Sequence, residues 1–342
     1  MKSINQKMIT LARESRGISQ SELAARIDMS SGNLSKIENS DIGITEEIIE
    51  QIAKETNYPA SFFTQQEDVF PEHLIYRKRE KVTQSLLTII NAKGNIIRLQ
   101  IQQLLKILNI SNPELPNFEV TEINTPQIIA QKVRKAWRLE KGIIEDTIKL
   151  IESNSIAVAS FEFGTERVDS RCILTETKHP IIIYNKSLLG DRQRYSIIFQ
   201  LGHLIMHTAF KIGRDRDIAH EANLFAAEFL MPEKDIKKDF ENGISLPLLA
   251  ELKQKWKVSM ISLLYRADDL GYLTSNQKRY LIQQFNEQKL RRREPLELDV
   301  PTEKPSLLRK WISDIKIKQK LDMKGMASIL NMKPDEFIEL YG

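Results

Sequence analysis

Residues 194–207 constrain this chain more than any other stretch, because they read Arg-Tyr-Ser-Ile-Ile-Phe-Gln-Leu-Gly-His-Leu-Ile-Met-His. A zinc-peptidase helix presents two histidines four residues apart, with a glutamate after the first histidine as general base. The corresponding places hold Phe199, Gln200 and His203. A phenyl ring has no lone pair for a metal, and an amide does not accept a proton near neutral pH. The pattern predicts a peptidase-like helix that lacks its first ligand and its base.

A second run supports this interpretation, reading His-Glu-Ala-Asn-Leu-Phe-Ala-Ala-Glu-Phe-Leu-Met-Pro and ending at Pro232. Together the two runs resemble the ImmA/IrrE family of metallopeptidase-like proteins, over roughly residues 126–284. The resemblance implies a zincin-like domain. It also implies that Phe199 replaces the first zinc ligand and Gln200 replaces the base. On the same resemblance, His203 keeps the second ligand and Glu221 keeps the third.

Three hypotheses compete for this site. An active zinc peptidase would have to recruit His207 or His220 in place of Phe199 and find a base other than Gln200. A metal-bound but inactive domain would use His203, His207 and Glu221. We favour a metal-free domain without catalytic residues and expect no cofactor, because His203 and Glu221 alone give zinc too few bonds to offset its dehydration.

The first 58 residues predict four short helices, at about residues 6–16, 20–27, 30–39 and 45–56. Gly17 suits a left-handed helix end. Ser19 and Ser30 are suited to cap the second and third helices. Leu34 and Ile37 lie three apart, so they are expected to face a core while the polar residues between them point elsewhere.

The runs Gly-Ile-Ser-Gln-Ser-Glu-Leu-Ala and Met-Ser-Ser-Gly-Asn-Leu-Ser-Lys-Ile-Glu-Asn resemble the Cro/C1-type (XRE) helix-turn-helix family. That resemblance implies a third helix in the major groove of double-stranded operator DNA. Its candidates for base contacts are Ser31, Asn33 and Ser35. Its candidates for backbone or mixed contacts are Gln20, Ser30, Lys36 and Asn39. A plain helical bundle with a solvated polar face is the less favoured alternative.

Residues 64–84 are predicted to be a linker, in which the basic cluster from Arg77 to Lys81 is more typical of a solvated charge run than of phosphate contacts. A long helix is predicted over about residues 86–110. Its apolar stripe, which includes Ile97 and Leu104, is too rich for an isolated surface helix. The stripe must pack against its own domain or against a second copy, and a homodimer is expected because it would supply two reading helices.

The rest of the chain predicts a mainly α protein with a small α+β domain. Helices are expected at 127–137, 143–153, 194–210 and 221–229, two more within 258–284, and strands at 156–161, 172–174 and 181–185. The predicted domains are a helix-turn-helix bundle (1–63), a linker with the long helix (64–125), the peptidase-like domain (126–290), and a linker with small C-terminal helices (291–342). We expect the last unit to be a packing or interaction element, and the peptidase-like site to lie between two helices.

Composition limits the possible binding partners and the cellular compartment. The net charge of +4 and the pI near 8.9 permit nucleic-acid binding without arguing for it. A single cysteine, Cys172, excludes an intrachain disulfide and fits a reducing cytoplasm. No apolar run reaches the roughly 18 residues that a membrane span requires.

These observations predict a DNA-binding transcriptional regulator whose peptidase-like domain detects a small molecule or a protein. The alternative from a different class is a zinc-dependent metalloprotease that cleaves a repressor. A third is a regulator linked to stress or mobile elements that acts mainly through protein contacts.

Overall fold

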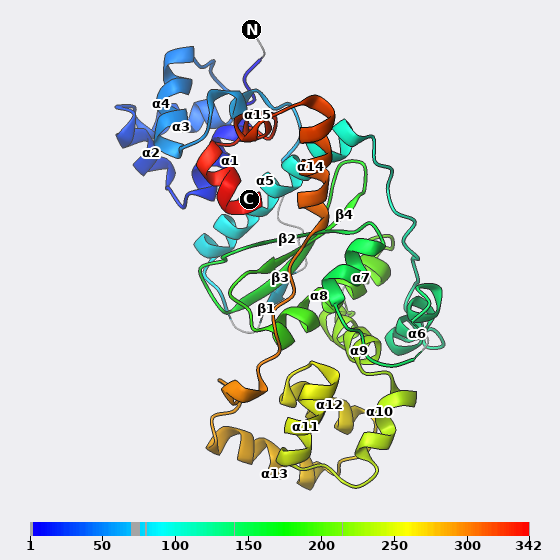
Figure 1. The fold of residues 1–342 in the computed structure, drawn as a ribbon. Helices are drawn as coiled ribbons and strands as arrows, with labels where there is room; N and C mark the ends of the chain where they lie inside the picture. Colours follow the sequence, from blue (N-terminus) through cyan, green and yellow to red (C-terminus); the bar gives the residue numbers. More distant parts are fainter. Residues whose placement is uncertain (1–2, 70–75, 79–80, 140, 214, 342) are drawn as a thin grey trace.

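The computed structural model describes residues 3–69, 76–78, 81–139, 141–213 and 215–341. A helical bundle forms one end of the molecule (Figure 1). Its helices begin and end within one residue of the predicted bounds: α1 (Lys7–Ser15), α2 (Gln20–Arg26), α3 (Ser31–Glu38) and α4 (Glu46–Thr56), followed by η1 (Ala60–Thr64). The predicted caps are in place, since Ser19 accepts a hydrogen bond from the Glu22 amide and Ser30 from the Asn33 amide, each at 3.2 Å.

The long helix α5 (Gln84–Leu108) is covered from two sides within the chain. Ala92, Ile96 and Leu99 join the core of the N-terminal bundle. Ile97 and Leu104 join a second core, which contains the sheet and the C-terminal helices. Of the two explanations for its apolar stripe, packing within its own chain is therefore the one that the structure shows.

A four-stranded mixed sheet forms the centre, with the order β1-β3-β4-β2. Its strands are β1 (Tyr76–Lys78), β2 (Ala157–Phe161), β3 (Val168–Leu174) and β4 (Pro180–Asn185). β2 runs parallel to β4, while β1 and β4 run antiparallel to β3. The three strands predicted from apolar runs are confirmed, but β1 corrects the prediction of a linker over 64–84. The sequence around β1 is polar and gives no local signal of a strand. β1 forms because it pairs with β3, far along the chain.

Successive residues of a strand point to opposite faces, and both faces of this sheet are buried. Ile182 and Tyr184 join the core that contains α8 (Gly190–Met206), whereas Ile181 and Ile183 join the core that contains α5. The result is a layer of helices on each face of the sheet (Figure 1). This explains why the strands read as unbroken apolar runs.

Further helices complete the side of the molecule that carries α8. They are α6 (Pro126–Ala136), α7 (Thr147–Ser153), α9 (Ile218–Leu230), α10 (Glu233–Phe240), α11 (Leu246–Trp256), α12 (Met260–Asp269) and α13 (Ser275–Glu287). Two of these helices, α10 and α11, were not predicted from the sequence. α7 begins four residues later than predicted, because the Asp146 carboxylate caps this helix by accepting the Lys149 amide at 2.8 Å.

The predicted linker at 291–306 includes η2 (Leu296–Leu298) and is fastened by ionic contacts. Lys253, almost fully buried, lies 2.6 Å from both Asp191 and Glu294. The Glu152 carboxylate accepts the amides of Ser306 and Leu307 at 3.0 Å and so caps the next helix. This segment is therefore integral to the fold.

The last helices are α14 (Leu307–Gln319), α15 (Met323–Ile329) and α16 (Pro334–Tyr341), and they pack on α5 and the sheet. Glu336 also reaches the N-terminal bundle, at 2.6 Å from Arg16 and 3.1 Å from the Asn57 amide. This unit, expected to be a packing or interaction element, packs within the chain. The predicted mainly α fold with one small α+β region is confirmed. Among the described helices, none is long and apolar enough to cross a membrane.

Candidate functional site

The outer face of α3 carries the side chains predicted to read DNA. Ser31, Asn33, Lys36 and Asn39 are exposed, while Leu34 and Ile37 are buried beneath them. A side chain at Gly32 would meet no atom within 4 Å, so this position also faces open space. Among the described residues none covers this face, as a helix that enters a major groove requires.

Gln20 and Ser35 differ from the other predicted contacts. The Gln20 amide donates to Glu38 at 2.8 Å, and Arg13 holds the same carboxylate at 2.8 and 3.0 Å. Ser35 is only partly exposed. Gln20 therefore belongs to an ionic network that joins α1, α2 and α3.

The peptidase-like helix α8 lies between the sheet and α9. Its polar residues Gln200 and His203 are fully buried. Gly202 permits this close packing, because a Cβ there would lie 3.0 Å from the Phe225 ring of α9. A hydrogen bond between His207, at the C-terminal end of α8, and Glu221 of α9 brings two of the predicted site residues together between these helices.

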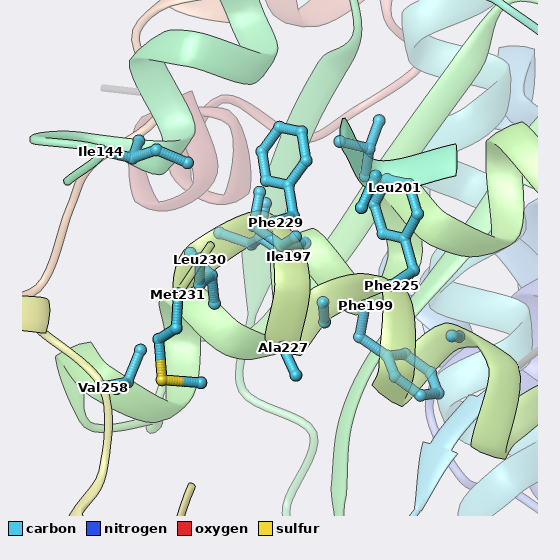
Figure 2. Packing of buried hydrophobic residues seen from close by; sticks show 14 of the residues in the cluster. Ile144, Ile197, Phe199, Leu201, Phe225, Ala227, Phe229, Leu230, Met231 and Val258 are labelled. Carbon is cyan, nitrogen blue, oxygen red and sulfur yellow. The ribbon is translucent and has the colours of Figure 1, made fainter. Parts of the chain in front are cut away.

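Phe199 belongs to the apolar core. Its side chain is 2 % exposed and packs in the cluster shared by α8 and α9 (Figure 2). Its ring meets the His203 ring edge-to-face, with centroids 4.7 Å apart. The place of the first ligand is thus filled by a packed ring with no donor atom.

Gln200 points toward the sheet. Its Nε2 donates to Ser170 Oγ of β3 at 3.1 Å, and Ser170 in turn donates to the Ser196 carbonyl at 3.2 Å. Its Oε1 has no hydrogen-bond partner among the described residues. An amide in this position links α8 to β3 and offers no basic atom.

His203 and His207 form a chain with Glu221. His207 Nε2 lies 2.8 Å from Glu221 Oε2, and the two Nδ1 atoms of His203 and His207 are 2.7 Å apart. A carboxylate only accepts, so His207 Nε2 carries the proton. In a neutral ring His207 Nδ1 is then the acceptor, and His203 Nδ1 donates to it. His203 Nε2 is left as a buried lone pair without a partner in the described part of the chain.

Arg216 pairs with the Glu221 carboxylate at the end of this row of hydrogen bonds, at 2.9 Å from Oε1 and 2.5 Å from Oε2, and so favours its charged form. Burial raises the pKa of Glu221, but the hydrogen bonds from Arg216 and His207 outweigh it and leave that pKa below its usual value. Burial, with His207 as neighbour, lowers the pKa of His203 to about 2. The pKa of His207 is also lowered, chiefly by burial and against the pull of Glu221. Both rings are therefore neutral at pH 7.

The arrangement does not fit a zinc ligand set. Two nitrogens in a tetrahedral zinc shell stand about 3.3 Å apart with both lone pairs aimed at the metal. Here the two Nδ1 atoms share a proton at 2.7 Å, and Arg216 holds both oxygens of Glu221. No group of three or more His, Cys, Asp or Glu side chains in the described ranges is arranged to hold a metal ion.

Some residues have surroundings that differ from those predicted from the sequence. Arg77, predicted to be part of a solvated charge run, is paired with the buried Asp169 at 3.0 Å. Arg79 and Glu80 of that run lie outside the described residues. His220, considered as a substitute ligand, is exposed. Arg216 was missed because it lies in a loop, and its five-residue spacing from Glu221 was the only local signal.

Comparison with known families places two regions of the chain. Residues 9–63 match the helix-turn-helix family model, of the XRE type. Residues 151–268 match the model of the IrrE N-terminal-like domain. No characterised protein matches the chain in a search of curated sequences. The two resemblances inferred from sequence motifs are confirmed.

Proposed function

We propose that this chain, which joins an XRE-type helix-turn-helix domain to an IrrE N-terminal-like domain, is a sequence-specific transcriptional regulator. In this proposal the IrrE-like domain has lost peptidase chemistry and serves as a sensor or interaction module. A ligand that binds one arrangement of the chain better than another would shift it between DNA-bound and free states.

The observation that carries the proposal is the filled site on α8. Phe199 packs where a ligand would stand, Gln200 donates to Ser170, and His203 is tied to His207. None of these groups is a base that would take a proton from a water at pH 7. The exposed polar face of α3 supports the DNA-binding half of the proposal independently.

Two further expectations belong to this proposal. We place the protein in the cytoplasm, where the buried Cys172 stays reduced. Burial raises the pKa of its thiol to about 12, so the thiol is unreactive.

We also expect a homodimer on DNA, because a dimer supplies two reading helices that can lie one DNA turn, about 34 Å, apart. Since α5 is covered from within the chain, the dimer contact must involve another surface.

Metal analysis tests the site. Protein purified without added zinc should hold less than about 0.1 zinc per chain, because its surviving donors give too few bonds to offset dehydration. Phe199→His places an imidazole against the His203 ring, whose Nε2 has no partner among the described residues, and should raise zinc affinity. Phe199→Leu is the matched control, since it changes the packing without adding a donor.

Cleavage of a co-encoded repressor should be absent in all three proteins, since Phe199→His does not restore the base. Stoichiometric zinc in the unmodified protein, lost on His207→Ala, would show that a shifted zinc site exists. That result would favour the metalloprotease alternative and contradict the proposal.

A further inference from the structure

A groove opens between α11, α13 and η2, at the end of the molecule opposite the N-terminal bundle (Figure 1). Its cavity volume is about 520 Å³, which lies within the range of about 300–1,000 Å³ that is typical of small-molecule sites. Apolar side chains line it from three helices: Leu246 and Ala250 of α11, Met260 of α12 and the buried Leu281 of α13. The groove therefore offers apolar surface on several sides.

The face of α13 that borders the groove carries no charge. Gln277, Tyr280, Gln284 and Gln288 lie three or four residues apart, so they share one side of the helix with Leu281. Gln284 Nε2 donates to the Tyr280 hydroxyl at 3.1 Å, which leaves Gln284 Oε1 as an acceptor. Amides and a phenol form hydrogen bonds with a neutral molecule. None of the described residues that line the groove is Asp, Glu, Lys or Arg.

The carboxylates on either side of η2 are already paired. Glu294 accepts a hydrogen bond from Lys253 Nζ at 2.6 Å, and Asp299 lies 2.5 Å from Arg293. A charged group in the groove would lose its hydration without finding an ionic partner among the lining residues. The groove is therefore suited to an uncharged molecule.

η2 connects the groove to the part of the chain that reaches the N-terminal bundle. Pro295 and Leu298 border the groove, and the chain then continues into α14, α15 and α16. These helices pack on α5 and the sheet, and Glu336 of α16 lies 2.6 Å from Arg16 of the bundle. A molecule in the groove would thus contact the segment that leads to the helix-turn-helix domain.

We propose that this groove binds a small, uncharged and largely apolar molecule, whose polar atoms form hydrogen bonds with the side-chain amides of α13. The inference rests on the proposed function, because it gives the sensor module a class of ligand and a place to bind it. A molecule that favours one position of η2 would shift the chain between the DNA-bound and free states.

The test compares two fluorescent probes on the full chain. N-phenyl-1-naphthylamine is uncharged, and 8-anilinonaphthalene-1-sulfonate has the same rings with an added sulfonate. The uncharged probe should bind saturably at one site per chain. The sulfonate should bind at least about tenfold more weakly, because its charge finds no partner in the groove.

Two variants place the probe. Ala250→Trp fills the groove and should weaken binding of the uncharged probe at least about tenfold. Ala136→Trp adds the same side chain at an exposed position of α6 outside the groove, and should leave binding unchanged. If Ala250→Trp does not fold, Tyr280→Ala decides the matter, because this side chain is 61 % exposed and its loss removes one side of the groove. It should weaken binding about three- to tenfold.

Hydrogen exchange gives an independent readout at η2. The amides of Leu298 and Asp299 donate to the Pro295 and Leu296 carbonyls at 3.0 Å. Their exchange should slow at least about threefold when the uncharged probe is bound, because a molecule against η2 opposes its opening.

Several results would overturn the proposal: binding that does not saturate, equal binding of the two probes, or unchanged binding in the folded groove variants. Unchanged exchange at η2 would do the same. Light scattering that shows a dimer dissociating as the probe binds would assign the groove to a second copy of the chain. Operator binding and zinc content, measured on the same samples, test the proposed function separately.

Discussion

The helices α3 and α8 both carry polar residues at the positions that their motifs predict, but they use them in opposite ways. On α3, Asn33 and Lys36 are exposed and α3 rests on a buried apolar row. On α8, Gln200 and His203 are fully buried and are held by β3 and His207. Side chains on an exposed face keep their ordinary pKa values and hydrogen-bonding capacity. On a buried face, both are set by the neighbouring groups.

This contrast shows which side-chain roles a sequence motif can predict. On an exposed helix, the spacing of polar and apolar residues already states which groups meet a partner. In a buried helix, one neighbouring group changes what each residue can do. Arg216 is such a group, because it takes both oxygens of Glu221 and so orders the proton positions along the histidine chain.

The largest expected effect concerns the buried His203 of α8 and the pH dependence of unfolding. The pKa of His203 is about 2 in the folded chain and about 6.5 when unfolded, so below pH 6.5 only the unfolded state binds this proton. The free energy of unfolding should therefore fall by up to about 1.4 kcal/mol for each unit that the pH falls below 6.5, or by about 3 kcal/mol between pH 7 and 4. His203→Leu should remove this share of the slope in urea unfolding.

His220→Leu is the control for that experiment, because His220 is an exposed histidine on the neighbouring α9. An equal loss of slope in this variant and in His203→Leu would show that the slope does not come from the buried ring. His179, whose pKa burial lowers to about 4, should keep part of the slope in the His203→Leu protein. A slope that is the same in the His203→Leu and unmodified proteins would show that His203 is not buried in the neutral form.

The next effect concerns the exposed Asn33 of α3. Asn33→Ala should cost about 1–3 kcal/mol of discrimination at one base position, because an amide pairs with two atoms of a base edge. Binding to fragments that vary only at that position measures it. The melting temperature should hardly change, since Asn33 is exposed. A uniform loss across all fragments would assign Asn33 to the DNA backbone instead.

The smallest effect concerns Lys36, also exposed on α3. Lys36→Ala should weaken binding to every sequence alike and lower the slope of log affinity against log salt by about 1, because one phosphate contact is lost. Titrations at several salt concentrations measure it. An altered base preference with an unchanged salt slope would place Lys36 against a base edge.

Local patterns predicted the N-terminal bundle closely because its caps and apolar spacings are short-range signals. Ser19 and Ser30 cap the helices that they were expected to cap. The strand β1 escaped prediction because its three residues are ordered by pairing with β3, far along the chain. The helix α11 was not predicted although it has a short-range signal, since Ser245 caps it by accepting the Leu248 amide at 3.4 Å.

For the site, the sequence by itself determined which chemistry is absent: Phe199 has no donor atom and Gln200 no basic one, wherever they lie. It also predicted that the third helix carries Asn33 and Lys36 on the side away from its apolar row. Only the tertiary structure decided that His203 donates to His207, that Arg216 holds Glu221, and that Arg77 lies against Phe199. Proton positions and ion pairs depend on distances of a few ångströms between distant segments, and a sequence motif fixes only spacings along one helix.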